Sequence, residues 1–497
     1  MRGQKRIAII GGGIAGLSAG IYAQLHGFRT TIYEKNSKPG GACMGFLNAG
    51  VPVEPAIRFL AGTKEGTPLY RCWCETGALG STLFVTPDSF FTLESSGTSV
   101  NFGQDIEAFE QDAAEISPED AETIRRFCSE VQTVQAYELP AECPADLLPP
   151  FRTFRTGSAG EAGKLLARLQ TVSLADFSEQ LHHPALSCAF QQVMPAGSTL
   201  AQLVLYYAKF LSGELAVPVG GSAGIIQRMV DCYLANDGEL QLNAPVKEII
   251  AANRAARGVA LVGGEHLLTH WVIAACDPAY TCRVLLQDRY GLEKKLQARY
   301  CAPEKYTTNS LVRLFFSVPV QTVPLARTFS FETGVIPAAG EGIDRLTMTQ
   351  FADDPTFVHS GRTVLAVDIP MPGRQAFRYW ESLAQKPRAY QTEIDGIAAS
   401  VQQELEKYFP EMLGQAVFLS CRTPIDYARQ SNVYQGSCTA FIPTAQAKPA
   451  AFTGRLPGLD HLLLAGQWLG PHAGMHTALV QGKFAVQRIC HDEHLTW

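Results

Sequence analysis

Three glycines near the N-terminus stand at the spacing of a phosphate-binding turn. Gly11, Gly13 and Gly16 fill the G-x-G-x-x-G positions, and Glu34 follows at the distance expected of an acid that binds ribose hydroxyls. Gly11 permits a tight turn, Gly13 removes a side chain that would hold the backbone away from a pyrophosphate, and Gly16 lets a helix pack closely against its strand. The pattern predicts a dinucleotide site. A carboxylate at position 34 would repel a 2′-phosphate, so FAD or NAD is favoured over NADP.

The segments around these glycines predict the strand-turn-helix-strand unit that such a site needs. Arg6–Ile10 is a short apolar run typical of a buried parallel strand. Apolar residues recur at helical spacing over residues 17–25, Gly27 is a typical helix terminator, and residues 29–33 read as a second strand. The N-terminus of the helix would face the anion with free N–H groups. A glycine turn of structural use alone would not need the acid at the end of the second strand.

Length and composition predict a globular protein of two domains. The chain has 497 residues, of which 46% are hydrophobic and 18% are charged. A net charge of −6 without Lys/Arg runs argues against a nucleic-acid partner. The 13 cysteines form no C-x-x-C pair and no zinc-like group, so we expect reduced thiols and no metal site. With no signal peptide or membrane-spanning segment in the pattern, we expect a cytoplasmic protein, peripheral to a membrane if its substrate is lipid-like.

Residues after the acid-bearing strand include further candidates for the site. Gly40 and Gly41 follow Pro39, which predicts a second close approach of backbone to ligand, with an ordinary loop as the alternative. Cys43 is expected to be a small buried thiol rather than a redox group. Arg58 stands among apolar residues and could pair with a phosphate or a substrate anion, or form a structural salt bridge.

The rest of the chain alternates between mixed regions and ordered α/β segments. An apolar stripe, Leu200 to Leu211, predicts a helix whose stripe packs in a core or lines an apolar cavity. Later segments predict a helix over 225–234, a strand carrying Val246 and Ile249, strands over 271–276 and 461–465, and a helix beginning at Met475.

Two G-x-S-x-G motifs allow a serine hydrolase as an alternative, but their settings argue against it. Ser18 lies inside the first expected helix, where no nucleophile elbow can form. Ser222 has a strand-turn-helix setting, yet no Asp and His follow it in a persuasive arrangement. Only one complete dinucleotide fingerprint is present, because residues 258–268 have adjacent glycines without a helix pattern after them.

Five segments in the same order resemble the FAD-dependent phytoene desaturase, carotenoid isomerase and amine oxidase superfamily, in its phytoene dehydrogenase-like branch. They are GGGIAGLSAG with YEKNSKPGG, AVPVGGSAGIIQRMV, VKEII with AACDP, RTPIDYARQSNVYQGSCTAFIPT, and LLLAGQWLGPHAGMHTALVQGKFA. The resemblance implies an α/β fold, with a Rossmann-like FAD-binding domain of the glutathione-reductase type and an inserted α+β substrate domain. The FAD-binding domain would comprise residues 1–79, 214–284 and 455–497, and the substrate domain residues 80–213 and 285–454.

The resemblance also implies which positions hold FAD. The glycine turn would meet the pyrophosphate, Glu34 the adenosine ribose, Val246 the adenine, and the helix opened by Gly474 and Met475 the O2 side of the flavin. A helix N-terminus at that place would stabilise an anionic reduced flavin. The implied set is Gly11, Gly13, Ile14, Ala15, Gly16, Glu34, Lys35, Gly40, Gly41, Ala42, Val246, Gly466, Gln467, Gly474 and Met475.

The last segment departs from the pattern P-G-G-G-x-P of the relatives. This chain has His472 and His476 in it, so two imidazoles would stand beside the expected flavin edge. Either could move a proton, because histidine titrates near neutral pH, or it could fill space or bond a flavin carbonyl. With Arg58, these two histidines are the candidate catalytic residues.

The function implied is an FAD-dependent oxidoreductase that desaturates or isomerises a hydrophobic polyene or lipid-like substrate by hydride transfer to flavin N5. An amine oxidase is the alternative, and an aromatic pair facing the flavin, with Tyr427 and Tyr434 as candidates, would favour it. A second alternative is a non-catalytic lipid-binding protein of the Rab GDP-dissociation-inhibitor type. The expected partners are a hydrophobic small molecule, transient contact with a membrane surface, and oxygen or a quinone as electron acceptor.

Overall fold

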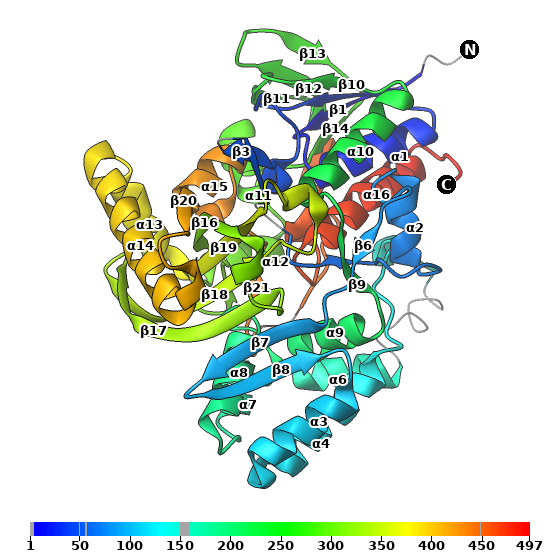
Figure 1. Cartoon of the computed structure of the whole chain (residues 1–497). Coiled ribbons are helices and arrows are strands. Elements are labelled where there is room, and N and C mark those ends of the chain that lie inside the picture. The colour runs from blue at the N-terminus through cyan, green and yellow to red at the C-terminus, as the bar shows by residue number, and fades with distance from the viewer. Residues whose placement is uncertain (1–3, 49, 55–56, 150–159, 448) are drawn as a thin grey trace.

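Two large β-sheets, three small sheets of two or three strands, and a layer of helices make up the described part of the molecule. The computed structural model describes residues 4–497 except 49, 55–56, 150–159 and 448. In Figure 1 the first sheet and both chain termini lie at the top, the second sheet lies below it, and a helical layer lies at the bottom. The α/β class predicted from the sequence is confirmed.

A parallel sheet forms around the N-terminal strand. β1 (Arg6–Ile10) pairs with β2 (Arg29–Tyr33) on one side and β14 (Trp271–Ala274) on the other, and β10 (Glu239–Gln241) and β23 (Leu459–Leu464) extend it. All these pairs are parallel, so the carboxyl ends of the strands meet at one edge. Ligands of such sheets bind at that edge.

An antiparallel extension completes this nine-stranded sheet. β11 (Val246–Ala252), β12 (Ala255–Leu261) and β13 (His266–Leu268) form a meander, and β12 joins β23. The short strand β22 (Arg455–Leu456) pairs antiparallel with β23. The adjacent glycines near position 263 therefore lie in a hairpin, as the lack of a helix pattern indicated.

Both faces of the central parallel strands β1 and β14 are buried, as expected for apolar runs of this kind. On one face Ile9 packs under α1 (Ile14–Leu25), α10 (Gly221–Ala235) and α16 (Met475–Asp492), and on the other Ile10 packs in a separate core with the meander. The last two helices come from distant parts of the chain, and both pack on α1.

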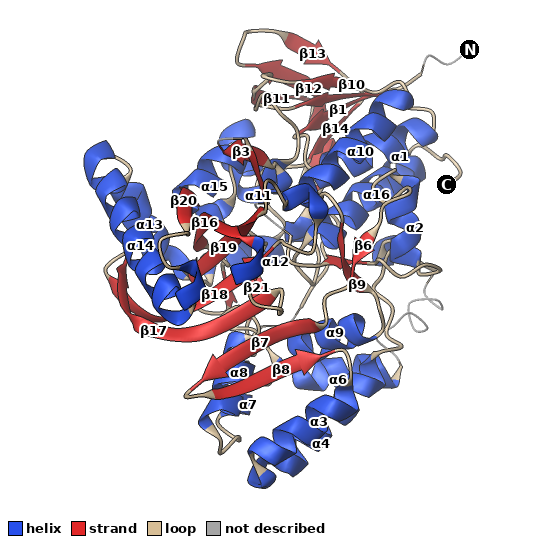
Figure 2. Cartoon of the chain, in the orientation of Figure 1, coloured by secondary structure: helices blue, strands red, loops and turns tan. Residues whose placement is uncertain are grey.

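The second sheet has seven strands in the order β20-β16-β19-β18-β17-β7-β8, with one parallel pair, β17 and β7. Figure 2 shows α13 (Gly373–Leu383) and α14 (Pro387–Tyr408) along its outer side. The alternation in β16 places Val312 and Leu314 in the core beneath these helices and Arg313 on the opposite face. The strands are β7 (Ser89–Ser95), β8 (Thr98–Gly103), β16 (Leu311–Pro319), β17 (Thr328–Ala338), β18 (Glu341–Gln350), β19 (Arg362–Pro370) and β20 (Val417–Arg422).

A helical layer packs against the β7–β8 hairpin. It comprises α3 (Ile106–Ile116), α4 (Ala121–Val134), α6 (Glu161–Leu169), α7 (Leu174–Ser178), α8 (Pro184–Gln192) and α9 (Leu200–Leu211). The stripe expected from the sequence faces this layer, because Tyr207 packs among the rings of Phe102, Phe109 and Phe127. Its use is therefore core packing.

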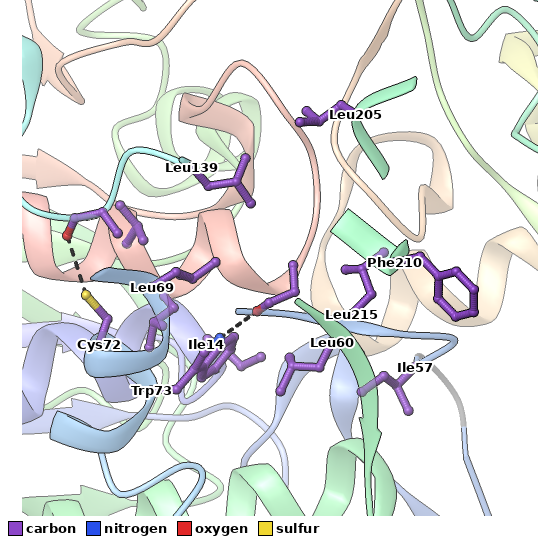
Figure 3. Packing of buried hydrophobic residues seen from close by; sticks show 14 of the residues in the cluster. Ile14, Ile57, Leu60, Leu69, Cys72, Trp73, Leu139, Leu205, Phe210 and Leu215 are labelled. Carbon is purple, nitrogen blue, oxygen red and sulfur yellow. Dashed lines mark hydrogen bonds between the residues drawn. The ribbon is translucent and has the colours of Figure 1, made fainter. Parts of the chain in front are cut away.

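A core of large side chains supports the centre of the molecule. In Figure 3, Trp73 of α2 (Pro68–Glu75) lies against Leu60 of β5 (Leu60–Ala61) and Ile14. The Trp73 indole donates a hydrogen bond of 2.9 Å to Ala61 O, and its side chain is fully buried. Other short elements are β3 (Phe46–Asn48), β4 (Val51–Val53), β6 (Phe84–Val85), β9 (Leu215–Pro218), α11 (Pro278–Tyr280), α12 (Lys294–Cys301), β15 (Tyr306–Thr307), α15 (Pro424–Ser431) and β21 (Ile442–Pro443).

Element ends differ by a few residues from those expected. α10 begins at Gly221, four residues before position 225, because Gly220 in the left-handed region already turns the chain into the helix. β14 ends at Ala274 and β23 begins at Leu459, whereas α16 begins at Met475 as predicted. The nine-stranded sheet draws its strands from within residues 6–33, 239–274 and 455–464, and the domain boundaries given above stay a prediction.

The described part of the chain contains no helix that is long and apolar enough to cross a membrane. Within the same residues, no group of His, Cys, Asp and Glu side chains is arranged to hold a metal ion. All 13 cysteines are free thiols.

Replacing Trp73 tests the central core. Trp73→Ala should lower the free energy of unfolding by about 3–5 kcal/mol, because it leaves a large cavity and an unpaired Ala61 carbonyl. Denaturant unfolding measures this change. Leu325→Ala is the control, since Leu325 is fully exposed, and a loss as large as that of Trp73→Ala would contradict the assignment of the core.

Candidate functional site

One cavity of about 850 Å³ brings the predicted site residues together, because its wall includes residues of both sheets and α9. Every candidate from the sequence except Gly16 and His472 lines it. The candidates on its wall are Gly11, Gly13, Ile14, Ala15, Glu34, Lys35, Gly40, Gly41, Ala42, Arg58, Val246, Gly466, Gln467, Gly474, Met475 and His476.

The glycine turn forms an open cradle at the N-terminus of α1. Gly11 has φ +103°, a conformation that favours glycine, and Gly13 is the residue before the helix. A Cβ at Gly13 would have its nearest neighbour at 3.9 Å, so the turn leaves room for a ligand. A Cβ at Gly16 would lie 1.9 Å from the Gly11 carbonyl oxygen. Gly16 therefore shapes the cradle from behind it, which is why it does not line the cavity.

Glu34 is held at the carboxyl end of β2. Its carboxylate accepts hydrogen bonds from Gly12 N at 2.8 Å and from Asn36 N at 2.9 Å and Asn36 Nδ2 at 2.8 Å. The side chain is only 4% exposed. These bonds orient one carboxylate edge toward the turn, at the place expected for a ribose-binding acid. Asn36 was not a candidate, although it stands two residues beyond the acid.

The second glycine pair is tied to the turn and to α15. Gly40 N donates to Gly12 O at 2.9 Å, and Gln430 Nε2 donates to Gly41 O at 2.7 Å. Lys35 Nζ donates to Asn432 Oδ1 at 2.8 Å. The chain around residues 429–432 thus belongs to the site. Its segment was included in the resemblance, but nothing in its residue types marked individual positions.

Asp277 is a further residue of the wall that sequence reasoning missed. It is 2% exposed and accepts backbone N–H groups of Ala279 at 2.7 Å, Tyr280 at 3.1 Å and Tyr434 at 3.0 Å. Burial raises the pKa of its carboxyl to about 6, although these donors oppose the shift. Its bonds fix the chain after β14 beside Val246 and the cradle. The AACDP segment was the only signal for it.

The N-terminus of α16 borders the other end of the cradle. Gly466 and Gly474 have φ values of +140° and +134°, and Gly474 N donates to Gln467 Oε1 at 3.1 Å. No side chain caps α16 and its first turn carries no acid. Free N–H groups and the positive end of the helix dipole are therefore available to a negative ligand atom at this wall.

The two histidines differ in position. His476 lines the cavity, is 8% exposed, and its Nε2 has no hydrogen-bond partner among the described residues. His472 does not line it. Burial lowers the pKa of His472 to about 4 and that of His476 to about 3, and the neighbouring His472 adds to the second shift. Both imidazoles are therefore neutral at pH 7, and the His476 ring offers one unpaired nitrogen to a ligand.

Arg58 lies two residues before β5 and contacts β7 and β17. Its Nε donates to Thr328 Oγ1 at 3.2 Å and its Nη2 to Phe90 O at 3.3 Å. Burial lowers the pKa of its guanidinium to about 10, while Asp368 opposes and Arg313 adds to the shift. Arg58 is thus protonated at neutral pH.

An apolar chamber adjoins the dinucleotide cradle within the same cavity. Tyr206 and Gln202 of α9 face it, opposite to the stripe that packs in the core. Its apolar wall comprises Phe59, Ala61, Phe90, Val193, Met194, Tyr206, Leu215, Leu311, Ile343 and Ile442. These residues come from distant segments, so the chamber could not be assembled from sequence spacing.

The serine motifs have structural uses. Ser18 Oγ donates to Leu479 O at 2.7 Å, which ties α1 to α16. Ser222 is fully buried and its Oγ donates to Glu54 Oε1 at 2.6 Å. In the described part of the chain neither serine is hydrogen-bonded to a histidine, which agrees with rejecting a hydrolase.

Comparison with known proteins agrees with a flavin-binding site. A sequence model of the family described as flavin containing amine oxidoreductase matches residues 14–490. A phytoene desaturase (lycopene-forming) of Pseudescherichia vulneris is 26% identical and covers 98% of this chain and 99% of its own. A chloroplastic prolycopene isomerase of Arabidopsis thaliana is 22% identical, covering 97% of this chain and 82% of its own.

Solved structures share the fold. An oxidoreductase from Methanosarcina mazei superimposes with a TM-score of 0.61 at 13% identity, covering 97% of this chain and 100% of its own. Cyclohexylamine oxidase from Brevibacterium oxydans gives 0.58 at 13% identity, with 99% and 100% covered. At this identity the likeness concerns the fold alone.

The dinucleotide of this site is FAD. The open cradle at Gly13, the acid at Glu34 and the free N-terminus of α16 fit its pyrophosphate, ribose and flavin ends in that order. Because the chain belongs to a flavin-containing family, FAD is favoured over NAD, the other dinucleotide that the glycine pattern allowed.

A methyl group at position 16 tests the cradle. Gly16→Ala should lower the amount of FAD that co-purifies with the protein at least about ten-fold, because the Cβ forces α1 away from Gly11 O. The ratio of flavin to protein absorbance measures it. Gly263→Ala is the matched control, since a Cβ there meets nothing within 4 Å, and equal losses in both variants would contradict the assignment.

The buried imidazole of His476 predicts a specific pH dependence. Its pKa is lower in the folded protein than the ordinary 6.5, so its stabilising effect is complete above pH 6.5 and is lost as the pH falls. His476→Leu should remove about 2 kcal/mol of the stability loss between pH 6.5 and pH 5. Denaturant unfolding at both pH values measures it. His494→Leu, at an exposed position, should keep the wild-type profile, and an unchanged profile for His476→Leu would contradict the prediction.

Proposed function

This chain belongs to the flavin containing amine oxidoreductase family and is an FAD-dependent enzyme, and from that premise we propose that it desaturates or isomerises a polyene or another long apolar molecule. The observation that carries the proposal is the apolar chamber that opens directly onto the FAD cradle in one cavity. The phytoene desaturase and prolycopene isomerase relatives match nearly the whole chain, which supports the same substrate class.

The residues of the site would hold the cofactor and position the substrate. Gly11, Glu34 and Gly474 would bind FAD, which when bound accepts a hydride from a C–H bond and passes the electrons to a second acceptor. The N–H groups at the start of α16 would stabilise negative charge that develops beside them. Phe59 and Tyr206 would hold an apolar chain against the cofactor and exclude water. Catalysis would thus be largely positioning, and the neutral His476 would contribute a hydrogen bond.

Amine oxidation, the alternative function, fits the chamber less well. Arg58 places a positive charge on its wall, which repels an alkylammonium substrate. Tyr427 lines the cavity, whereas Tyr434 packs against Tyr300 and Phe441. The candidate aromatic pair is therefore not brought together.

A non-catalytic lipid-binding protein would not need the complete cradle. We propose instead that this enzyme, in the cytoplasm, takes its apolar substrate during transient contact with a membrane surface. Oxygen or a quinone would then accept the electrons. Oxygen uptake with and without an added quinone distinguishes these two acceptors.

Anaerobic titration tests the substrate class. Phytoene and lycopene isomers in detergent micelles should bleach or perturb the visible flavin band of the purified enzyme, while putrescine and cyclohexylamine should leave it unchanged. Chromatography of the extracted polyene distinguishes a desaturated product from a geometric isomer. Free FAD with the same compounds is the control. Bleaching by an amine and by none of the polyenes would contradict the proposal and favour amine oxidation.

A further inference from the structure

Arg58 carries a positive charge that its protein neighbours do not neutralise. Its two hydrogen bonds go to neutral oxygens, Thr328 Oγ1 and Phe90 O. Among the described residues, no carboxylate lies within ion-pair distance of it. The guanidinium lies 5.7 Å from the centre of the Phe90 ring and 5.2 Å from that of Phe91. Such ring contacts stabilise a cation but do not balance its charge.

The carboxylate that acts on Arg58, that of Asp368, is already paired with another arginine. Asp368 of β19 faces Arg313 of β16 in the sheet register, and the two form a bidentate pair at 2.6 and 2.8 Å. The cluster of Arg58, Arg313 and Asp368 therefore carries one surplus positive charge. On the rest of the chamber wall, Arg345 pairs with Glu332 and Asp344 is exposed.

The surplus charge lies in the chamber rather than at the phosphate cradle. The groups that contact Arg58 belong to β7 and β17, and those that shift its pKa belong to β16 and β19. The cradle is built from β1, α1 and β2. A guanidinium has five N–H donors, and the described residues accept from its Nε and Nη2 alone. The other donors are available to a ligand that enters the chamber.

We propose that Arg58 binds the carboxylate of the substrate, so that the preferred substrate is a long apolar molecule with a carboxylate end. The proposal rests on the oxidoreductase function proposed above and names its substrate class. Guanidinium and carboxylate form paired, charge-assisted hydrogen bonds. One carboxylate neutralises the one surplus charge. A phosphate monoester would bring close to two negative charges next to Asp368 and is disfavoured.

Binding of three probes with one polyene chain tests the assignment. The purified holoenzyme is titrated anaerobically with all-trans-retinoic acid, methyl retinoate and retinyl phosphate, and the flavin absorption and the tryptophan fluorescence are followed. Trp468 lines the cavity and serves as a reporter. The acid should bind about ten- to a hundred-fold more tightly than the ester. Equal affinities for acid and ester, or tighter binding of the phosphate than of the acid, would overturn the proposal.

Variants assign the effect to Arg58. Arg58→Met should abolish the preference for the acid over the ester, and Arg58→Lys should retain part of it. Arg362→Met is the matched control, because Arg362 also donates only to neutral oxygens, of Ser317 and Gln415, and lies outside the cavity. The control should keep the full preference. If Arg58→Met instead weakens acid and ester equally, or loses FAD, Arg58 serves the apolar wall or the cofactor and the proposal is wrong.

The same titrations separate this proposal from the proposed function. A preference for the acid that depends on Arg58 supports the anchor even if no polyene bleaches the flavin, which would contradict only the proposed reaction. Bleaching by polyene hydrocarbons, together with equal binding of acid and ester, would support the reaction and overturn the anchor.

Discussion

The close approach of α1 to the glycine turn is the contact on which the rest of the site depends. Only a glycine at position 16 lets the helix lie against Gly11 O, because a Cβ would come within 1.9 Å of that oxygen. α16 then packs along α1, with Ser18 bonded to Leu479 O. Both helices therefore begin at the same cavity, and their N-termini border the two ends of the FAD cradle.

Charge is distributed unevenly along this cavity. At the cradle, Glu34 is held by N–H donors, and the wall beside it carries Asp277, whose pKa burial raises. In the chamber, Arg58 is left with a positive charge and His476 is neutral at pH 7. Charges in such water-poor surroundings interact strongly. At the cradle, Glu34 thus suits the ribose hydroxyls of FAD, and the N–H groups at the N-terminus of α1 suit its phosphates. The chamber suits an apolar molecule with a negative end.

The sequence predicted the cradle better than the chamber. Gly11, Gly16 and Glu34 belong to one local unit whose spacing is set by strand and helix geometry, so residue types alone located them. Asp277 and the chamber wall come together only through the packing of distant segments. The apolar stripe on α9 shows what periodicity can and cannot predict. Its spacing identified a buried helix face, but it could not tell that the opposite face, with Tyr206, lines the cavity.

A crystal structure of the purified protein soaked with all-trans-retinoic acid tests most directly whether one cavity joins FAD to an apolar chamber with an anionic anchor. Electron density for FAD should extend from Glu34 to Gly474. The polyene should lie along Phe59 and Tyr206 with its carboxylate on Arg58. FAD density elsewhere, or a polyene bound outside the cavity, would contradict this arrangement.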